Sequence, residues 1–360
     1  MKITIKSILY ISIALSLVSC GERSLNMSVS PVPVSSATAK TPATWELISE
    51  YRMPPEEGRF TSKFDFIPDH RLWSHGSSDP KADQLMYSDD FGKSWKFVNL
   101  PEPGFGADEI RFVDSLHGWV MGDSTLLKTQ DGGQSWKNVR LPVKSKIVTL
   151  NTLEFTDPNH GFVAGSTTIM VERGLGTIAF GIKILCTSNG GESWLICYQN
   201  QINNTVLKMF SSGRATMALV DQKNLLITTD RGITWKQKQW DFRATDIAAS
   251  PDGVLWTTSE DGVLRSSADL GDSWQVLPMM PKPYPEFRWD SLSFDAIGFG
   301  VAVGSKGAVA FTSDGGKSWA LQSDVNLQNN LWTVRVQKPF VAIFDGTQLY
   351  VFRMKVTEKD

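Results

Sequence analysis

The sequence predicts an all-β fold: a seven-bladed β-propeller of four-stranded antiparallel blades, closed by the N-terminal strand. Three observations support this prediction. An eight-residue pattern occurs six times, its copies start 39 to 58 residues apart, and incomplete sets of strands remain at the two ends of the array. Repeats of about 40–50 residues are typical of single propeller blades, and a ring leaves no open sheet edge between its ends.

The repeated pattern reads Ser/Thr-x-Asp-x-Gly-x-Ser/Thr-Trp. Its carboxylate can accept hydrogen bonds from a turn, its glycine permits a tight hairpin, and its tryptophan covers the hairpin with an apolar face. The third position and the tryptophan are Asp90 and Trp95, Asp131 and Trp136, Asn189 and Trp194, Asp230 and Trp235, Asp269 and Trp274, and Asp314 and Trp319. We expect these residues to be dispersed around the rim, where their role is structural.

The segments upstream of the pattern predict the remaining strands of each blade. Residues 112–122, 155–165 and 294–304 align without gaps as strand, turn and strand, and residues 66–76 form a looser copy. A short third strand follows, such as 125–129, and the repeated pattern then leads into the fourth strand, as in 136–141.

The two ends of the chain complete one another. Residues 331–336, 340–346 and 348–354 predict three strands with no repeated pattern after them, whereas residues 44–48 match a fourth strand. Trp45 falls where Trp95 falls in its own repeat. We therefore expect seven blades in one domain, residues 45–356, followed by a tail at 357–360.

The N-terminus predicts export and lipidation. Lys2 and Lys6 precede an apolar stretch at 8–18, as in a signal peptide spanning residues 1–19. The stretch ends in Leu-Val-Ser-Cys, which resembles a bacterial lipobox with Cys20 as the lipidated residue. The alternative is an ordinary secretory signal. Residues 20–44 predict a flexible tether to a bacterial membrane, the outer membrane facing the periplasm if the cell is Gram-negative.

Composition excludes some functions and suggests one covalent bond. The chain has 360 residues, with 36 basic and 38 acidic ones and no basic stripe, so nucleic acid is not an expected partner. Export leaves Cys186 and Cys197, on adjacent strands of one predicted hairpin, as candidates for a disulfide. The alternative is two buried free thiols.

Few residues have a spacing suited to catalysis. His117 and His160 occupy equivalent repeat positions in different blades, so they cannot share one site, and no metal or other cofactor is expected. Asp65, Arg111, Glu154 and Arg335 precede the core residue of their innermost strands and should lie near the axis. Their mixed charges predict ion pairs between blades, and the alternative is a polar binding pocket.

A candidate binding face lies opposite the repeated pattern. The longest connection between blades, residues 277–289, contains Met279, Met280, Tyr284 and Trp289. An insertion at 167–183 should form an extended hairpin on the same face. Arg111 and Arg335 complete the residues predicted for this surface, whose composition suits either packing or contact with a partner.

The eight-residue pattern resembles the Asp-box, or BNR, repeat. Together with the predicted anchor, phrases such as LLKTQDGGQSWKNV (Leu126 to Val139) resemble lipoprotein propellers related to the photosystem II stability/assembly factor family. This resemblance implies a non-catalytic scaffold that binds membrane-protein assembly intermediates. We expect the protein to be monomeric and its partner to be a membrane or envelope protein. Asp-boxes also occur in sialidases, and YRMPP at Tyr51 resembles their arginine motif. The alternative function is thus a sialidase-like or other glycoside hydrolase acting on an extracytoplasmic glycan, with Arg52 binding a substrate carboxylate.

Overall fold

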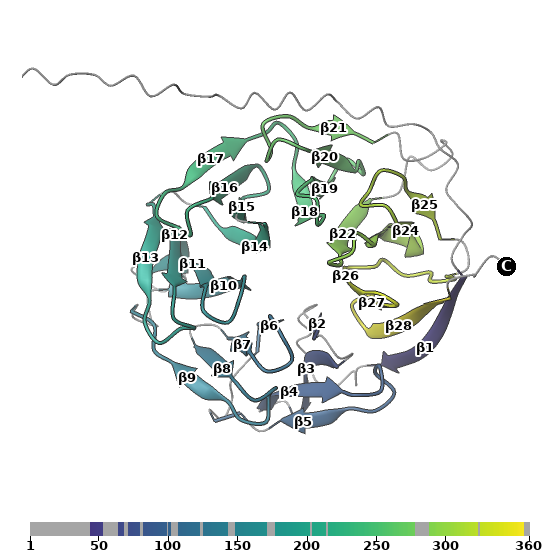
Figure 1. Ribbon diagram of the computed structural model, residues 1–360, viewed down its shortest axis with the longest axis horizontal. Helices are drawn as coiled ribbons and strands as arrows, with labels where there is room; N and C mark the ends of the chain where they lie inside the picture. The colour runs from purple at the N-terminus through teal and green to yellow at the C-terminus, as the bar shows by residue number, and fades with distance from the viewer. Residues whose placement is uncertain are drawn as a thin grey trace, which may run out of the picture. The chain divides into compact units, whose positions relative to one another are not determined.

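Seven four-stranded antiparallel sheets form from the described residues and surround a common axis (Figure 1), which confirms the predicted fold class. The structure is a computed structural model that describes residues 44–52, 64–67, 71–79, 82–98, 100–101, 107–122, 125–142, 148–170, 177–201, 204–213, 215–277, 288–322 and 325–355. All of these belong to one compact unit, Ser35–Asp360. The predicted signal peptide, Cys20, nearly all of the tether and the tail lie outside the described residues.

Each blade runs from an innermost strand at the axis to an outermost strand at the rim. Blades 1 to 3 consist of β2 (Phe64–Phe66), β3 (Leu72–Asp79), β4 (Ala82–Ser88) and β5 (Lys96–Val98); β6 (Glu109–Phe112), β7 (Gly118–Met121), β8 (Leu126–Thr129) and β9 (Lys137–Val139); and β10 (Val148–Phe155), β11 (Gly161–Met170), β12 (Thr177–Thr187) and β13 (Leu195–Gln199). Blades 4 to 6 consist of β14 (Val206–Ser212), β15 (Ala215–Val220), β16 (Asn224–Thr228) and β17 (Lys236–Gln239); β18 (Ala244–Ala249), β19 (Leu255–Ser259), β20 (Arg265–Ser267) and β21 (Gln275–Val276); and β22 (Trp289–Phe294), β23 (Gly300–Gly304), β24 (Val309–Thr312) and β25 (Ala320–Leu321).

Blade 7 joins the two ends of the domain. It consists of β26 (Thr333–Gln337), β27 (Phe340–Phe344), β28 (Gln348–Lys355) and, outermost, β1 (Thr44–Arg52). β1 pairs antiparallel with β28 from Thr44 opposite Lys355 onward. Trp45 is buried, and its ring lies 6.1 Å from that of Phe311 in blade 6. The N-terminal strand thus closes the ring as predicted.

Apolar side chains between neighbouring blades form the core. In one such cluster, Trp119 of blade 2 stacks on Phe155 of blade 3 with the ring centroids 3.5 Å apart. Burial of apolar surface at every joint stabilises blades that would be marginal alone. In the described part of the chain, helix is limited to the short 3-10 turn η1 (Ser305–Gly307), and no helix there is long and apolar enough to cross a membrane.

The antiparallel strands give the propeller two faces. The box face carries the turns between first and second strands and between third and fourth strands, where the Asp-boxes lie. The loop face carries the turns between second and third strands and the connections between blades. The predicted hairpin of blade 3 is confirmed as an extension toward the loop face, with β11 and β12 paired as far as Met170 opposite Thr177.

Candidate functional site

The Asp-boxes are local hydrogen-bonded turns. In blade 2 the Thr129 hydroxyl donates to Asp131 at 2.8 Å and accepts the Gly133 N–H at 2.9 Å. Ser135 donates its N–H and its hydroxyl to the two Asp131 oxygens at 2.9 and 2.5 Å. These bonds, that of the Ser135 hydroxyl first, lower the pKa of Asp131 to about 2. The carboxylate is therefore engaged by its own turn rather than directed at a substrate.

Box 3 keeps this geometry with an amide. The Asn189 side-chain oxygen accepts the Ser193 N–H at 3.0 Å, and its Nδ2 donates to the Ser193 hydroxyl at 2.9 Å. Since a neutral amide replaces the carboxylate without loss of the turn, the box does not depend on its charge for its shape.

The box tryptophans fasten each blade to the one before it. Trp136 of blade 2 lies 6.0 Å from Trp73 of blade 1, and Trp319 of blade 6 lies 5.6 Å from Trp256 of blade 5, both edge-to-face. The box glycines allow this approach. A Cβ on Gly133, which has φ +85°, would lie 2.3 Å from the Trp73 ring. These contacts account for the repeated pattern without any catalytic role.

A second set of contacts joins the blades at the axis. A polar side chain on one innermost strand accepts a main-chain N–H from the innermost strand of the next blade. The pairs are Asp65 with Phe112, Glu109 with Leu153, Thr152 with Met209, Asp246 with Leu292, and Ser291 with Val334, at 3.0 to 3.4 Å. An innermost strand is a sheet edge, so its inward N–H groups need such acceptors.

Two ion pairs strengthen this inner ring. Arg111 of blade 2 contacts Glu154 of blade 3 at 3.1 Å, which confirms the predicted pairing between blades. The charge of Glu154 raises the pKa of Arg111, while burial raises the pKa of Glu154 against that attraction. Burial also raises the pKa of Asp65, although Arg111 and Arg335 oppose it.

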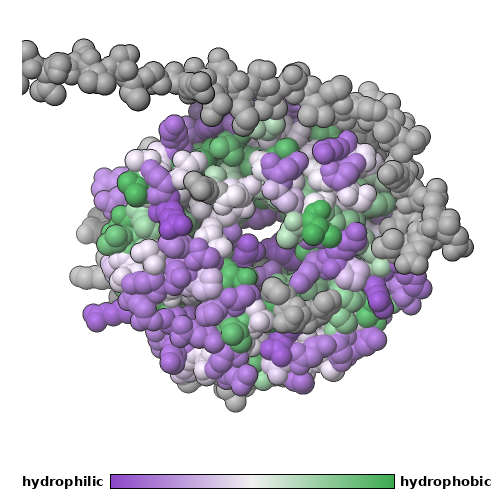
Figure 2. All heavy atoms as spheres, viewed as in Figure 1, coloured by the Kyte–Doolittle hydropathy of each residue, from purple (hydrophilic) through white to green (hydrophobic). Residues whose placement is uncertain are grey.

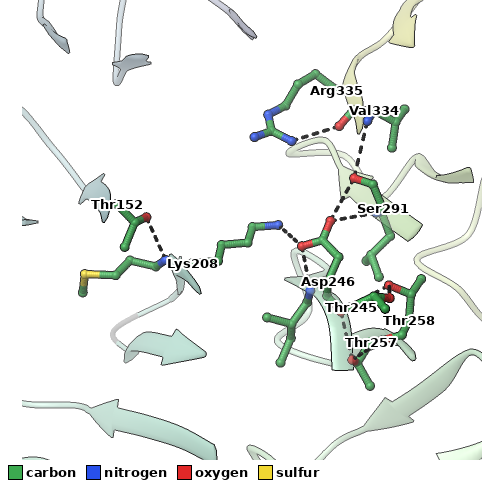
Figure 3. Close-up of polar contacts among 12 residues, drawn as sticks. Thr152, Lys208, Thr245, Asp246, Thr257, Thr258, Ser291, Val334 and Arg335 are labelled. Carbon is green, nitrogen blue, oxygen red and sulfur yellow. Dashed lines mark hydrogen bonds and ion pairs between the residues drawn. The ribbon is translucent and has the colours of Figure 1, made fainter. Parts of the chain in front are cut away.

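The other ion pair was missed by sequence reasoning. Lys208 Nζ of blade 4 lies 2.6 Å from Asp246 Oδ1 of blade 5 (Figure 3). Asp246 also accepts the Ser291 hydroxyl at 2.9 Å. Burial disfavours the charge on Asp246, but Lys208 and the hydrogen bonds hold its pKa below the usual value. Burial lowers the pKa of Lys208. Because a lysine cannot accept an N–H, this joint uses a side-chain pair instead.

Arg335 differs from the other axial charges. It projects from β26, and Figure 3 shows its guanidinium donating to the Val334 carbonyl of its own strand, at 3.0 Å. Among the described residues, no carboxylate lies within ion-pair distance of it. Figure 2 shows that the propeller is open at its centre, with hydrophilic residues along much of the border. Arg335 therefore provides a half-buried cation on the innermost ring, available to the opening.

The structure separates the residues of the glycoside hydrolase alternative from this axis. Arg52 ends β1, the outermost strand of blade 7, opposite Gln348. It cannot join Arg111 and Arg335 on one substrate.

His117 and His160 each bind the carboxylate three residues before them, Asp114 and Asp157, within separate turns of the box face. In the part of the chain described, no three His, Cys, Asp or Glu residues gather as metal ligands.

The remaining predicted site residues have mixed outcomes. Cys186 and Cys197 are joined in a disulfide, with Cα atoms 6.0 Å apart, between β12 and β13. Met279, Met280 and Tyr284 lie outside the described residues. Trp289 is only 2% exposed and packs in the core between blades 5 and 6, so its assignment to a contact surface was wrong. Trp332, 53% exposed at the loop face beside β26, was missed.

The sequence is similar to proteins described as photosystem II assembly factors. A family model described as photosynthesis system II assembly factor YCF48 matches residues 87–195. The chloroplastic photosystem II stability/assembly factor HCF136 of Arabidopsis thaliana is 24% identical over 96% of this chain and 85% of its own. The photosystem II assembly lipoprotein Ycf48 of Synechococcus sp. (strain CC9902) is 26% identical over 68% of this chain and 71% of its own.

Solved structures show the same fold at low identity. A structure of YCF48 bound to D1 peptide has a TM-score of 0.65 at 19% identity and covers 89% of this chain and 99% of its own. A virginiamycin B lyase from Staphylococcus aureus has a TM-score of 0.62 at 9% identity and covers 87% of this chain and all of its own. Since the fold alone is shared with both a peptide-binding protein and an enzyme, it does not decide function.

Proposed function

Because the chain is a photosystem II assembly factor-like Asp-box propeller, we propose that it is a lipid-anchored scaffold of the cell envelope that binds a polypeptide without catalysis. Its relatives are assembly factors, and one structure with the same fold holds a peptide. The partner we propose is an extracytoplasmic segment of a membrane protein during assembly. In a photosynthetic host, a photosystem subunit would be such a partner.

The observation that carries this proposal is the exposure of Trp332 on the loop face. Its side chain is 53% exposed, whereas the rim tryptophans of the boxes are buried or half-buried against neighbouring blades. Exposed tryptophans are frequent anchors of protein interfaces because they bury a large rigid surface on binding. Trp332 immediately precedes β26, which carries Arg335, and its indole lies beside Gly346 in the turn between β27 and β28, so a partner held by Trp332 would contact the loop face of blade 7.

The charged groups of the described axis favour binding over catalysis. Arg111, Glu154, Lys208 and Asp246 are occupied by contacts between blades. Hydrolysis of a glycoside requires two carboxyl groups that flank one bond, and one of them must be free to act as an acid or a nucleophile. We propose that these carboxylates maintain the ring instead.

Recovery of a partner from detergent-solubilised envelopes with the full chain tests the binding function. Trp332→Ala should reduce recovery of that partner by at least about tenfold, as expected for a hot-spot tryptophan. Ile297→Ser is the matched control, because Ile297 is 71% exposed on the box face. Deletion of residues 279–285 tests the rest of the predicted loop surface. Equal recovery by wild type, Trp332→Ala and the deletion variant would contradict binding through this face.

The anchor needs its own experiment. Cys20 follows the predicted lipobox, and one relative is named a lipoprotein. Growth with a clickable fatty acid should label the wild-type chain and leave Cys20→Ser unlabelled. Label that persists in Cys20→Ser would place the lipid elsewhere or remove the anchor from the proposal.

A further inference from the structure

We propose that Arg335 is the centre of an axial binding site for a single carboxylate group. The inference rests on the proposed function insofar as that carboxylate comes from a bound polypeptide, either as its C-terminus or as an acidic side chain. A small free carboxylic acid offers the same chemistry, and the experiment below separates these sources.

The orientation of the guanidinium supports a carboxylate ligand. Arg335 Nη1 donates to the Val334 carbonyl, which fixes the plane of the group. Among the described residues, Nε and Nη2 have no hydrogen-bond partner. These two donors form the edge of the guanidinium that binds a carboxylate through two parallel hydrogen bonds. The half-buried side chain lies on an innermost strand, where Figure 2 shows the centre of the propeller to be open.

The neighbouring cationic side chains already form ion pairs. Arg111 contacts Glu154 at 3.1 Å and Lys208 contacts Asp246 at 2.6 Å, each across a joint between blades. Displacing either carboxylate would leave a partly buried charge without its partner, which is costly. An incoming anion therefore meets one available cation of the described ring, namely Arg335.

The charge around the opening limits the kind of anion. The contacts described above involve four acidic and three basic side chains of the innermost strands. The acidic ones are Asp65, Glu109, Glu154 and Asp246, and the basic ones are Arg111, Lys208 and Arg335. These carboxylates repel a phosphate or another polyanion more strongly than a singly charged group, and a planar carboxylate also matches the two-donor edge of Arg335. Asp65, where burial raises the pKa and the charges of Arg111 and Arg335 oppose that rise, is one carboxylate that competes with such a ligand.

The position of Trp332 extends the site toward a polypeptide. Trp332 is exposed three residues before Arg335, which separates their Cα atoms by about 10 Å along an extended strand. A chain whose apolar side chain rests on Trp332 could thus place a carboxylate at Arg335. This arrangement joins an apolar anchor on the loop face to a charged anchor within the ring.

The test is a titration of the full chain labelled with ¹⁵N, followed at the arginine Nε–H resonances. The probes are N-acetyl-trialanine with a free C-terminus, the same peptide as its amide, N-acetyl-aspartate amide, and acetate. A carboxylate should shift the Arg335 resonance, and the peptide acid should bind at least about tenfold more tightly than its amide, the factor expected for hydrogen bonds to a charged group. Binding of acetate alone would identify a small-acid site, while tighter binding of the peptide acid or of the aspartate probe would identify which polypeptide carboxylate is held.

Variants establish that Arg335 is responsible. Arg335→Gln should weaken binding of the free-acid peptide at least about tenfold. Arg335→Lys, which keeps the charge and loses the fork, should give an intermediate affinity, and Asp65→Asn should tighten binding by removing the competitor. Arg353→Gln, at an exposed arginine of β28, is the matched control and should bind as wild type does.

Several outcomes would overturn the site. They are the absence of any shift at Arg335 with all carboxylate probes, equal binding of peptide acid and amide, and wild-type affinity in folded Arg335→Gln. If Arg335→Gln does not fold, an unchanged affinity in Arg335→Lys together with no gain in Asp65→Asn has the same meaning. Failure of this titration with retention of an envelope partner through Trp332 would refute the carboxylate site and leave the scaffold function intact.

Discussion

Replacing Asp246 with alanine should destabilise the propeller by about 4 kcal/mol. The side chain of Asp246 is only 12% exposed and serves three blades at once. It binds Lys208 at 2.6 Å, accepts the Ser291 hydroxyl at 2.9 Å and accepts the Leu292 N–H at 3.0 Å. The substitution removes all of these acceptor contacts while every donor remains in place.

The magnitude follows from the donors left behind. Breaking a buried ion pair costs about 3–5 kcal/mol, because the remaining charge is left without compensation. Lys208 is a quarter exposed and can be partly rehydrated, so the lower end, about 3 kcal/mol, applies to it. The Leu292 N–H and the Ser291 hydroxyl each add about 1 kcal/mol or less when water reaches the vacated space.

Urea unfolding followed by tryptophan fluorescence measures this loss as a shift of the midpoint at constant slope. The double-mutant cycle with Lys208→Met is the decisive control. In that background the charge is gone, so Asp246→Ala should cost about 2 kcal/mol less than in wild type. A loss below about 1 kcal/mol for Asp246→Ala, or the same loss in both backgrounds, would refute the assignment of this pair as a joint between blades 4 and 5.

Three further predictions concern the rim and the closure of the ring. Cys186→Ser with Cys197→Ser should lower the free energy of unfolding by about 2–3 kcal/mol, since the bond closes a short loop, and a reducing agent should shift the urea midpoint of wild type but not of the variant. Asp131→Ala should cost about 1 kcal/mol or less near neutral pH. The pKa of Asp131 in the folded chain, about 2, lies below its ordinary value of 3.8. The stability that the carboxylate contributes is therefore present above the ordinary pKa and is lost as the pH falls through the folded pKa. The two proteins should converge in acid, and a constant difference down to about pH 2 would contradict this. Trp45→Ala should cost about 3–5 kcal/mol by emptying the contact between β1 and blade 6, and limited proteolysis should then cut first near β1; an unchanged cleavage pattern would show that β1 does not close the ring.

The rim of the fold was predictable because its signal is local. The residues of a box lie within eight positions of one another, and their hydrogen bonds connect residues two or four positions apart, so each copy can be recognised by itself. Trp45 could be placed at the opposite end of the chain because the same fourth strand was missing after β28. Repetition thus supplied the long-range information that a single copy lacks.

The axis was only partly predictable because its contacts join different blades. Sequence reasoning considered only the residue immediately before the core phenylalanine, as at Arg111 and Glu154. Lys208 and Asp246 lie two positions earlier in their strands, in register with Glu109, so this alignment did not reveal them. The usable signal was the buried apolar residue that follows each of them, Met209 and Ile247. The solvent exposure of single tryptophan side chains was harder still to predict, because no sequence pattern separates Trp289, which is buried, from Trp332, which is exposed.

The contrast between blade 7 and the others explains why its residues are the best candidates for binding. At the position that Arg335 occupies in β26, Arg111 and Glu154 are held by their contact with one another, and Asp65 accepts an N–H from blade 2. Arg335 has no such contact within the described residues, and β1 rather than a box supplies the outer fastening of its blade. A side chain that makes no contact with a neighbouring blade can bind a ligand without loss of an interaction that stabilises the fold. We therefore expect substitutions at Arg335 and Trp332 to reduce binding more than stability, and those at Asp246 to do the opposite.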